Sequence, residues 1–257
     1  MYSRGLKSIK ITSQVREVLG LEDDVTELAP SELLSAILKA PVDLLYNGGI
    51  GTYVKASTET NAQVGDKAND ALRVNGNELR AKIVGEGGNL GFTQLGRVEA
   101  ARNGVIINTD AIDNSAGVET RDREVNIKIL VDRLVARGEL SPDERASFIE
   151  SLRDEVGAKV LETNVEQNVL LQGEFNYGTL GIDVYKRLMR DLEKHAGLNR
   201  TVEFLPTDKE LQARFDTTGE MLTRPELSVL AAYVKIYLTH ALEETDFADD
   251  PYLEGLL

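Results

Sequence analysis

Three loops of this 257-residue chain combine glycine with asparagine or acidic side chains, and each follows a short apolar run. They occupy residues 47–52, 85–89 and 108–117. Glycine lets the backbone approach a ligand closely, and the backbone amides of such turns bind phosphate or carboxylate groups. Asparagine offers a donor and an acceptor together, which suits a carboxamide. These residue types therefore indicate a site for an anionic or amide-bearing ligand.

An alternation of strands, loops and helices would bring the three loops to one edge of a sheet. The predicted strands are 42–46, 81–84 and 105–107, and the helices expected after them are 57–73, 94–102 and about 120–136. The repeated order of strand, loop and helix is typical of βαβ units with parallel strands. Ligands of open parallel sheets bind beyond the carboxyl ends of the strands, which is where these loops begin.

From residue 139 onward the sequence predicts helices alone. Capping-box patterns begin at Ser141, Thr207 and Thr223, and each predicts the start of a helix. The first helix is expected to reach about residue 172. A polar stretch at 173–178 should separate it from a further helix over 182–195. We therefore expect an α/β region over residues 1–138 and an all-α region over residues 139–257.

Composition excludes several classes of function. The chain carries 29 basic and 43 acidic residues, a net charge of −14, which argues against a nucleic-acid partner. Without cysteine it has no disulfide or thiolate metal site, which fits a cytoplasmic protein. Two histidines leave little material for a histidine-based metal site. No apolar run approaches the length of a membrane span, and the first ten residues lack the apolar core of a signal peptide.

Each loop taken alone has a simpler explanation, because glycine makes tight turns and asparagine caps helices. The G-x-G-x-x-G dinucleotide pattern fails in the second loop, where residue 90 is leucine. We expect Glu86 to cap or orient its loop rather than act as a general base. Arg97 could reach a phosphate, although we expect an exposed salt bridge. The residues themselves thus predict a ligand-binding sheet edge without naming the ligand.

The amino-acid sequences of the loops resemble those of the glutamate dehydrogenases. KIVGEGGN at 82–89, followed by Thr93, resembles their K-[IV]-V-x-E-G-A-N…T segment, and TDAIDNSAGV at 109–118 resembles P-D-x-x-x-N-A-G-G-V. VDLLYNGGI at 42–50 stands where they carry D-[IV]-x-x-P-A-A-L. The strings APVDLLYNGGIGTYVKAS, DKANDALRVNG, IDNSAGVETRDREVNIKIL and LTRPELSVLAAYVKIYL resemble the very large, NAD-specific bacterial members.

This resemblance implies an oxidoreductase that transfers a hydride from the α-carbon of L-glutamate to NAD and hydrolyses the imine to 2-oxoglutarate and ammonium. It also implies that residues 1–138 are a partial Rossmann-like dinucleotide-binding domain. Asn89 matches the family residue beside the nicotinamide ribose, and Asn114 matches the one near the nicotinamide and the substrate. The other expected cofactor-binding residues are Gly48, Gly49, Gly87 and Gly88.

Arg121 departs from the family, which usually has serine at this position close to the substrate carboxylate. An arginine here could pair with that carboxylate bidentately, or it could be exposed beside Asp122 and Glu124. The sequence does not decide between these alternatives.

The resemblance further implies that the chain is the carboxyl-terminal part of a longer polypeptide, because the family's catalytic lysine and aspartate match nothing in it. We expect no catalytic residue and no metal ion in this part, and no activity from it alone. Its expected partners are the upstream domains of its own polypeptide and further copies in a homo-oligomer. In the alternative hypothesis, residues 139–257 form a helical assembly or interaction module without a catalytic role. A dehydrogenase for another amino acid is a third possibility.

Overall fold

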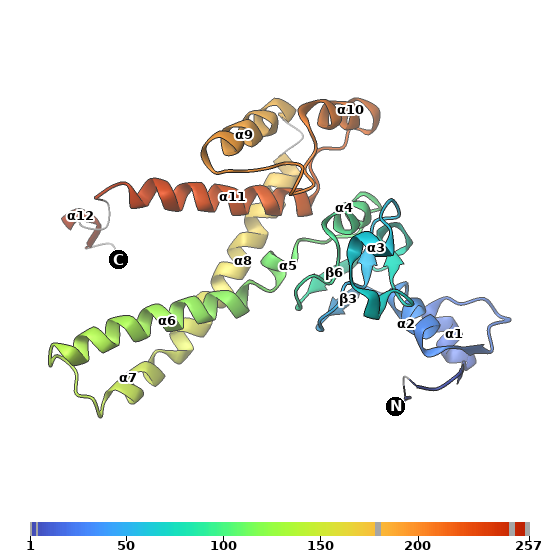
Figure 1. Ribbon diagram of the computed structural model, residues 1–257, viewed down its shortest axis with the longest axis horizontal. Coiled ribbons are helices and arrows are strands. Elements are labelled where there is room, and N and C mark those ends of the chain that lie inside the picture. The colour runs from blue at the N-terminus through green and yellow to red at the C-terminus, as the bar shows by residue number, and fades with distance from the viewer. Residues whose placement is uncertain (1, 4, 178–180, 247–249, 255–257) are drawn as a thin grey trace.

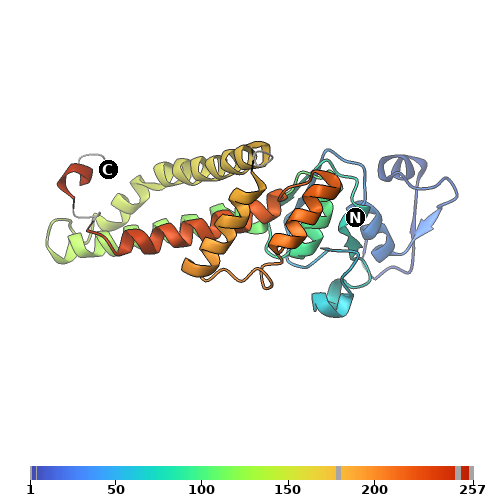
Figure 2. The ribbon, with the colours of Figure 1, turned by 90° about the horizontal axis from the view of Figure 1, so that it is seen from above.

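The computed structural model describes residues 2–3, 5–177, 181–246 and 250–254. The described chain is elongated, with a strand-containing region at one end and long helices extending away from it (Figures 1 and 2). All the named strands lie between residues 9 and 86, and only helices follow them. This agrees with the predicted order of an α/β region followed by a helical region.

The predicted parallel pairing is confirmed. Strand β3 (Leu44–Asn47) pairs in parallel with β6 (Ile83–Glu86), with Leu44 opposite Ile83. The third predicted strand contributes only one parallel bridge, between Ile83 and Ile106. The order across the sheet is therefore β3, β6 and the segment around Ile106, so the loops that follow them begin at one edge. On the inner side Val84 and Ile107 are buried in a common core.

Two smaller pairings flank this sheet. Strands β4 (Val54–Lys55) and β5 (Val74–Asn75) are parallel. Strands β1 (Ile9–Lys10) and β2 (Glu27–Leu28) are antiparallel, which the sequence did not predict. Helices α1 (Ser13–Leu19) and α2 (Pro30–Leu38) lie in the same amino-terminal part of the chain.

The predicted helix over residues 57–73 is wrong. Only one turn, α3 (Asn61–Val64), and the 3-10 turns η1 (Lys67–Asn69) and η2 (Gly76–Glu78) form near this stretch. The reason is Arg73, whose buried guanidinium donates to the carbonyl of Thr52 at 2.8 Å and to Asp70 Oδ1 at 2.6 Å. These bonds close the segment as a compact loop, and they replace the backbone bonds of a regular helix.

Helix α4 (Gln94–Arg102) has the predicted bounds. The predicted polar loop 108–117, however, is largely helical, because it contains α5 (Asp110–Asp113) and the start of α6 (Ser115–Ala136). Carboxylates in the first turn of a helix are stabilised by the helix dipole, which explains how an acidic segment folds into α5.

The helical region contains α7 (Arg145–Ser151), α8 (Arg153–Tyr177), α9 (Ile182–His195), α10 (Asp208–Thr218), α11 (Arg224–Glu243) and α12 (Pro251–Glu254). The single helix predicted from residue 141 is therefore two helices, and α8 continues through most of the predicted interruption at 173–178; residue 178 lies outside the described residues. The capping boxes at Thr207 and Thr223 are confirmed, whereas α7 begins only at Arg145.

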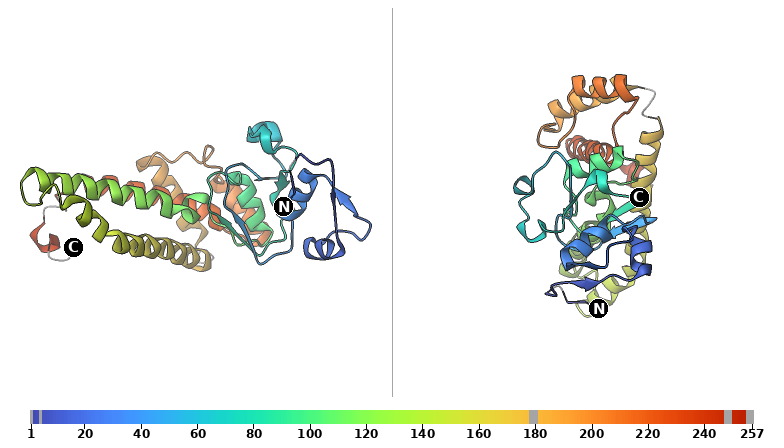
Figure 3. Two further views of the ribbon diagram at one scale, coloured as in Figure 1. Left: turned by 90° about the horizontal axis from the view of Figure 1, so that it is seen from below. Right: turned by 90° about the vertical axis from the view of Figure 1, so that its right-hand side faces the viewer.

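Helices α6, α7 and α8 form an arm that projects away from the sheet (Figure 3). Helices α9, α10 and α11 pack around a separate core that contains Met189, Leu211 and Leu230. None of the helices in the described ranges is both long enough and apolar enough to cross a membrane.

Two glycines give opposite predictions for an added methyl group. A Cβ on Gly76 would lie 2.5 Å from the carbonyl oxygen of Gly96, at the contact between η2 and α4. A Cβ on Gly157, inside α8, would meet no described atom within 4 Å. We expect Gly76→Ala to lower the free energy of unfolding by about 1–3 kcal/mol. We expect Gly157→Ala to raise it by about 1 kcal/mol, because alanine favours a helix. Urea denaturation measures both, and an unchanged midpoint for Gly76→Ala would contradict the close packing.

Candidate functional site

The carboxyl ends of β3 and β6 bring the first two loops into backbone contact. The N–H of Gly88 donates to the carbonyl of Asn47 at 3.0 Å. A Cβ on Gly88 would lie 2.7 Å from the carbonyl oxygen of Gly49, and one on Gly91 would lie 1.8 Å from Asn47 Nδ2. Side chains at residues 88 and 91 would therefore push these loops apart.

The third loop joins this edge through two asparagines. Asn114 Nδ2 donates to Asn89 Oδ1 at 2.9 Å, although the two residues are 25 positions apart. Asn89 is exposed and Asn114 is half-buried. Within the described part of the chain, neither side chain makes another hydrogen bond, so the pair keeps amide donors and a carbonyl acceptor for a ligand. The two asparagines selected from the sequence thus lie together on an accessible edge.

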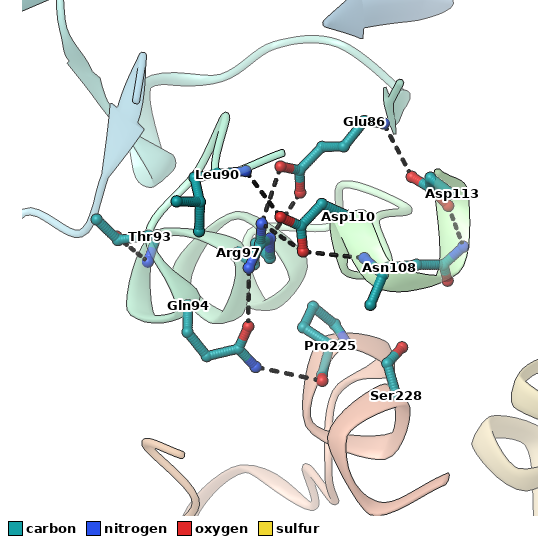
Figure 4. Close-up of polar contacts among 12 residues, drawn as sticks. Glu86, Leu90, Thr93, Gln94, Arg97, Asn108, Asp110, Asp113, Pro225 and Ser228 are labelled. Carbon is teal, nitrogen blue, oxygen red and sulfur yellow. Dashed lines mark hydrogen bonds and ion pairs between the residues drawn. The ribbon is translucent and has the colours of Figure 1, made fainter. Parts of the chain in front are cut away.

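A buried ion pair supports this edge from beneath. Arg97 in α4 donates to both oxygens of Glu86 at the end of β6, at 2.6 and 2.9 Å. Its guanidinium also lies 3.2 Å from Asp110. The other oxygen of Asp110 accepts the N–H of Leu90 at 2.7 Å. Figure 4 shows these residues converging from β6, α4 and α5, so one guanidinium connects all three segments.

Burial changes the pKa of two carboxyl groups near Arg97, those of Glu86 and Asp113. Burial raises the pKa of Glu86 and outweighs the opposing effect of Arg97, and the negative charges of Asp110 and Asp113 raise it further. Burial also raises the pKa of Asp113, against hydrogen bonds from the Asn108 side chain and the Glu86 backbone that lower it. Arg97 therefore faces several acidic groups, and removing it would leave the buried charge of Glu86 unbalanced.

One expectation about this cluster needs correction: Arg97 is 5% exposed, so its salt bridge is buried rather than exposed. Glu86 is fully buried with both oxygens on Arg97, so it does not cap its loop. Its contacts fit the other expected role, because Arg97 links it to Asp110, which holds the loop at Leu90. The sequence could not reveal this, because the three segments that bury the pair meet only in the folded chain.

The other expected site residues lie on or near the same edge. Gly48 and Gly49 are exposed, and Gly87 and Gly88 are half-buried. Arg121 is exposed about two turns along α6 from Asn114, on the same face of that helix. Its charge contributes to a lowered pKa of Glu124, after the larger effect of Lys128. No described contact of Arg121 tests its expected role.

Asn47 is a site residue that our sequence reasoning missed. Its Oδ1 accepts the N–H of Gly49 at 3.3 Å, whereas its buried Nδ2 has no partner among the described atoms. It also lines a cavity of about 620 Å³ between β3 and α2, with apolar neighbours such as Leu34 and Phe92. An asparagine directly before two glycines was the available signal. In the described ranges no cluster of three His, Asp or Glu side chains could hold a metal ion.

This geometry defines a class of protein. A parallel pairing whose polar loops gather at the carboxyl ends of its strands is the arrangement of the α/β ligand-binding proteins. Comparison with known families narrows the class. A family model described as "Bacterial NAD-glutamate dehydrogenase, catalytic domain" matches residues 1–174, and one described as "Glutamate dehydrogenase, C-terminal" matches residues 219–257. The chain belongs to the bacterial NAD-glutamate dehydrogenase family.

Curated relatives agree with this assignment. The chain is 51% identical over 253 residues to the NAD-specific glutamate dehydrogenase of Pseudomonas aeruginosa. It is 49% identical to the NAD-specific glutamate dehydrogenases of Mycobacterium tuberculosis and Halomonas elongata. The alignments cover 97–98% of this chain but only 15–16% of each relative. This agrees with the expectation that the chain corresponds to part of a much longer polypeptide.

The buried pair gives an asymmetric prediction for stability. We expect Arg97→Met to lower the free energy of unfolding by about 3–5 kcal/mol, because it leaves Glu86 buried without a cation. We expect Glu86→Gln to cost about 1.5 kcal/mol, because Arg97 keeps Asp110 and an amide oxygen. Chemical denaturation monitored by circular dichroism measures both. Arg102→Gln, which breaks an exposed pair with Glu220, is the control and should change little. Equal losses for the two buried variants would contradict the arrangement.

Proposed function

We propose that this chain forms part of an NAD-dependent glutamate dehydrogenase, to which residues 1–138 contribute the later portion of a Rossmann-like dinucleotide-binding domain and residues 139–257 a helical domain. The observation that carries the proposal is the contact between Asn89 and Asn114, because these two residues match the family's nicotinamide-side asparagines and they meet at the carboxyl edge of a parallel sheet. Family membership supplies the reaction: oxidative deamination of L-glutamate to 2-oxoglutarate and ammonium.

The residues of this edge fit the chemical groups of NAD. The Asn89 and Asn114 amides keep donors and an acceptor that can bind a carboxamide or a ribose hydroxyl. Gly48 and Gly49 leave the backbone bare for close approach of the cofactor, whereas Gly87 and Gly88 lie against Tyr46 and Gly49 and allow the loops to meet beside it. The unpartnered Nδ2 of Asn47 offers a further donor beside them. When bound, NAD supplies the hydride acceptor, and the protein supplies position and polarity.

This part of the chain supplies only some of the residues expected to contact the substrate. We place Asn114 and Arg121 nearest the substrate, since they share a face of α6 that begins at the cofactor edge. A guanidinium there can bind one carboxylate of L-glutamate or 2-oxoglutarate in a bidentate manner. The residues that exchange protons with the substrate are expected in the remainder of the longer polypeptide. We place the enzyme in the cytoplasm, and the absence of cysteine from this 257-residue chain supports that placement.

This proposal predicts a clear division of activity. The 257-residue chain, given glutamate and NAD, should produce no NADH absorbance above background, whereas the longer polypeptide that carries this sequence should turn over. In that polypeptide Asn89→Ala and Asn114→Ala should each raise the dissociation constant for NAD by about 10-fold, because each removes a hydrogen bond to a polar ligand. Calorimetry with NAD measures the loss. Arg102→Gln serves as the matched surface control, and unchanged NAD affinity in both asparagine variants would refute the proposed site.

A specific observation also supports the assembly hypothesis for the helical region. Several large apolar side chains on the arm are exposed, among them Leu161 and Val165 on α8 and Ile129 on α6. Leu161 and Val165 are one helical turn apart and so share a face. Contiguous exposed apolar surface of this kind marks protein–protein contacts. We therefore propose a homo-oligomer, or contact with other domains of the same polypeptide, alongside the enzymatic role.

The assembly hypothesis predicts self-association of the isolated chain. Size-exclusion chromatography with light scattering should give a mass above 28.2 kDa, and Leu161→Glu with Val165→Glu should return it to the monomer. Exposed positions tolerate this change, so circular dichroism should show unaltered helix content. Glu162→Gln with Glu166→Gln, on neighbouring positions of α8, is the control for altered charge. A monomeric parent chain would contradict self-association through this face.

A further inference from the structure

The first residue of α11, Arg224, lies buried against the loop that leads to Asn114. Its Nε donates to Asn108 Oδ1 at 2.9 Å, across 116 positions of sequence. Its Nη1 donates to Gln172 Oε1 at 2.8 Å, and its Nη2 lies 3.4 Å from Asn168 Oδ1. One guanidinium at the start of α11 thus connects the sheet edge with α8.

Neutral amides accept all three of these bonds. Arg224 is 8% exposed, and no carboxylate of the described residues lies within ion-pair distance of it. Burial lowers the pKa of Arg224, and the negative charge of Asp113 opposes that effect. A buried cation without an ion pair is costly for stability, and an apolar side chain would fill the space more favourably. Its position therefore needs an explanation other than packing.

Asn108 transmits the contact from Arg224 to Asp113. Its Oδ1 accepts from Arg224, while its Nδ2 donates to Asp113 Oδ1 at 2.8 Å and to Asn168 Oδ1 at 2.9 Å. A cation on one side and a carboxylate on the other leave the amide a single orientation. The second oxygen of Asp113 accepts the N–H of Glu86 at 3.0 Å. The carboxylate is therefore held at a defined distance from the end of β6.

Asn114 directly follows this fixed carboxylate. The backbone around it is also held from α8, where Asn164 Nδ2 donates to the carbonyl of Ile112 and to Ser115 Oγ, both at 2.9 Å. Among the described residues the Asn114 side chain bonds to Asn89 alone, so its direction depends on where the 112–115 segment sits. Displacement of Asp113 would displace the amide that faces the cofactor.

We propose that Arg224 is a positioning residue for the cofactor site, which orients Asn114 through Asn108 and Asp113. The inference rests on the proposed function, and it gives the carboxyl-terminal helix a role in binding NAD in addition to assembly. Arg224 itself touches neither cofactor nor substrate in this scheme. Its effect on affinity must therefore pass through Asn114.

A double-mutant cycle in the longer polypeptide tests this dependence, with NAD affinity measured by calorimetry. Arg224→Gln and Asn114→Ala should each raise the dissociation constant by about 10-fold, and the double variant should lose little more than either alone. Arg102→Gln is the matched control, since Arg102 in α4 pairs with Glu220 just before α11 and so bridges the same regions at the surface. It should change NAD affinity less than twofold, and its effect should add to that of Asn114→Ala.

The outcomes separate the two proposals. Losses that multiply in the Arg224 and Asn114 double variant would overturn the positioning role, because Arg224 would then act independently of Asn114. Unchanged NAD affinity in Asn114→Ala alone would also overturn the positioning role, whereas unchanged affinity in both Asn89→Ala and Asn114→Ala would overturn the proposed cofactor site itself. Thermal melting checks that each variant is folded at the assay temperature. If Arg224→Gln does not fold, Asn108→Ala interrupts the same connection at its centre, and the same cycle is read with it.

Discussion

Neutralisation of the Glu86 carboxylate is the constraint on which the candidate site depends. The carboxylate is fully buried at the end of β6, where an unpaired charge would be unstable, and Arg97 is the cation that balances it. Because Arg97 belongs to the first half of α4, that helix must lie against the carboxyl edge of the sheet. Asp110 then binds the same guanidinium and holds the N–H of Leu90. The loops that carry Asn89 and Asn114 are therefore positioned by one charge cluster, although neither asparagine belongs to it.

The second constraint is steric. The loops after β3 and β6 approach so closely that Gly88 faces the backbone of Gly49 and Gly91 faces the side chain of Asn47. Glycine is required at residue 88 for reasons of space rather than of backbone torsion, since Gly88 has no positive φ. At residue 91 a side chain would first meet the end of the Asn47 side chain. The charge cluster fixes how far β6, α4 and α5 lie from one another beneath the edge. The glycines permit the close approach of the two loops above it. Together they hold the amides of Asn89 and Asn114 in contact at the edge.

Local pattern explains which features could be predicted from the sequence. The bounds of α4 follow from Thr93 as a capping residue and from Gly104 after its end, and parallel pairing follows from the repeated strand, loop and helix order. The compact loop closed by Arg73 could not be predicted, because the bonds of Arg73 to Thr52 and Asp70 form only when the chain folds back on itself. The same holds for the burial of Arg97. The sequence resemblance to the family identified Asn89 and Asn114, but it did not identify Asn108. Asn108 has no proposed contact with the cofactor and acts only through the residues that it binds.

The contacts at the amino-terminal end of α11 bear on the choice between an enzymatic part and an assembly module. Gln94 in α4 donates to the carbonyl of Pro225 at 3.2 Å, and Arg224 reaches Asn108 beside the sheet. The start of α11 is thus committed to the strand-containing region. Farther along, Leu238 and Leu242 are exposed, as are several apolar residues of the arm. One helix can therefore serve both roles: its first turn holds the sheet edge, its middle part packs in the helical core, and its exposed carboxyl-terminal part and the arm offer apolar surface for other subunits or domains.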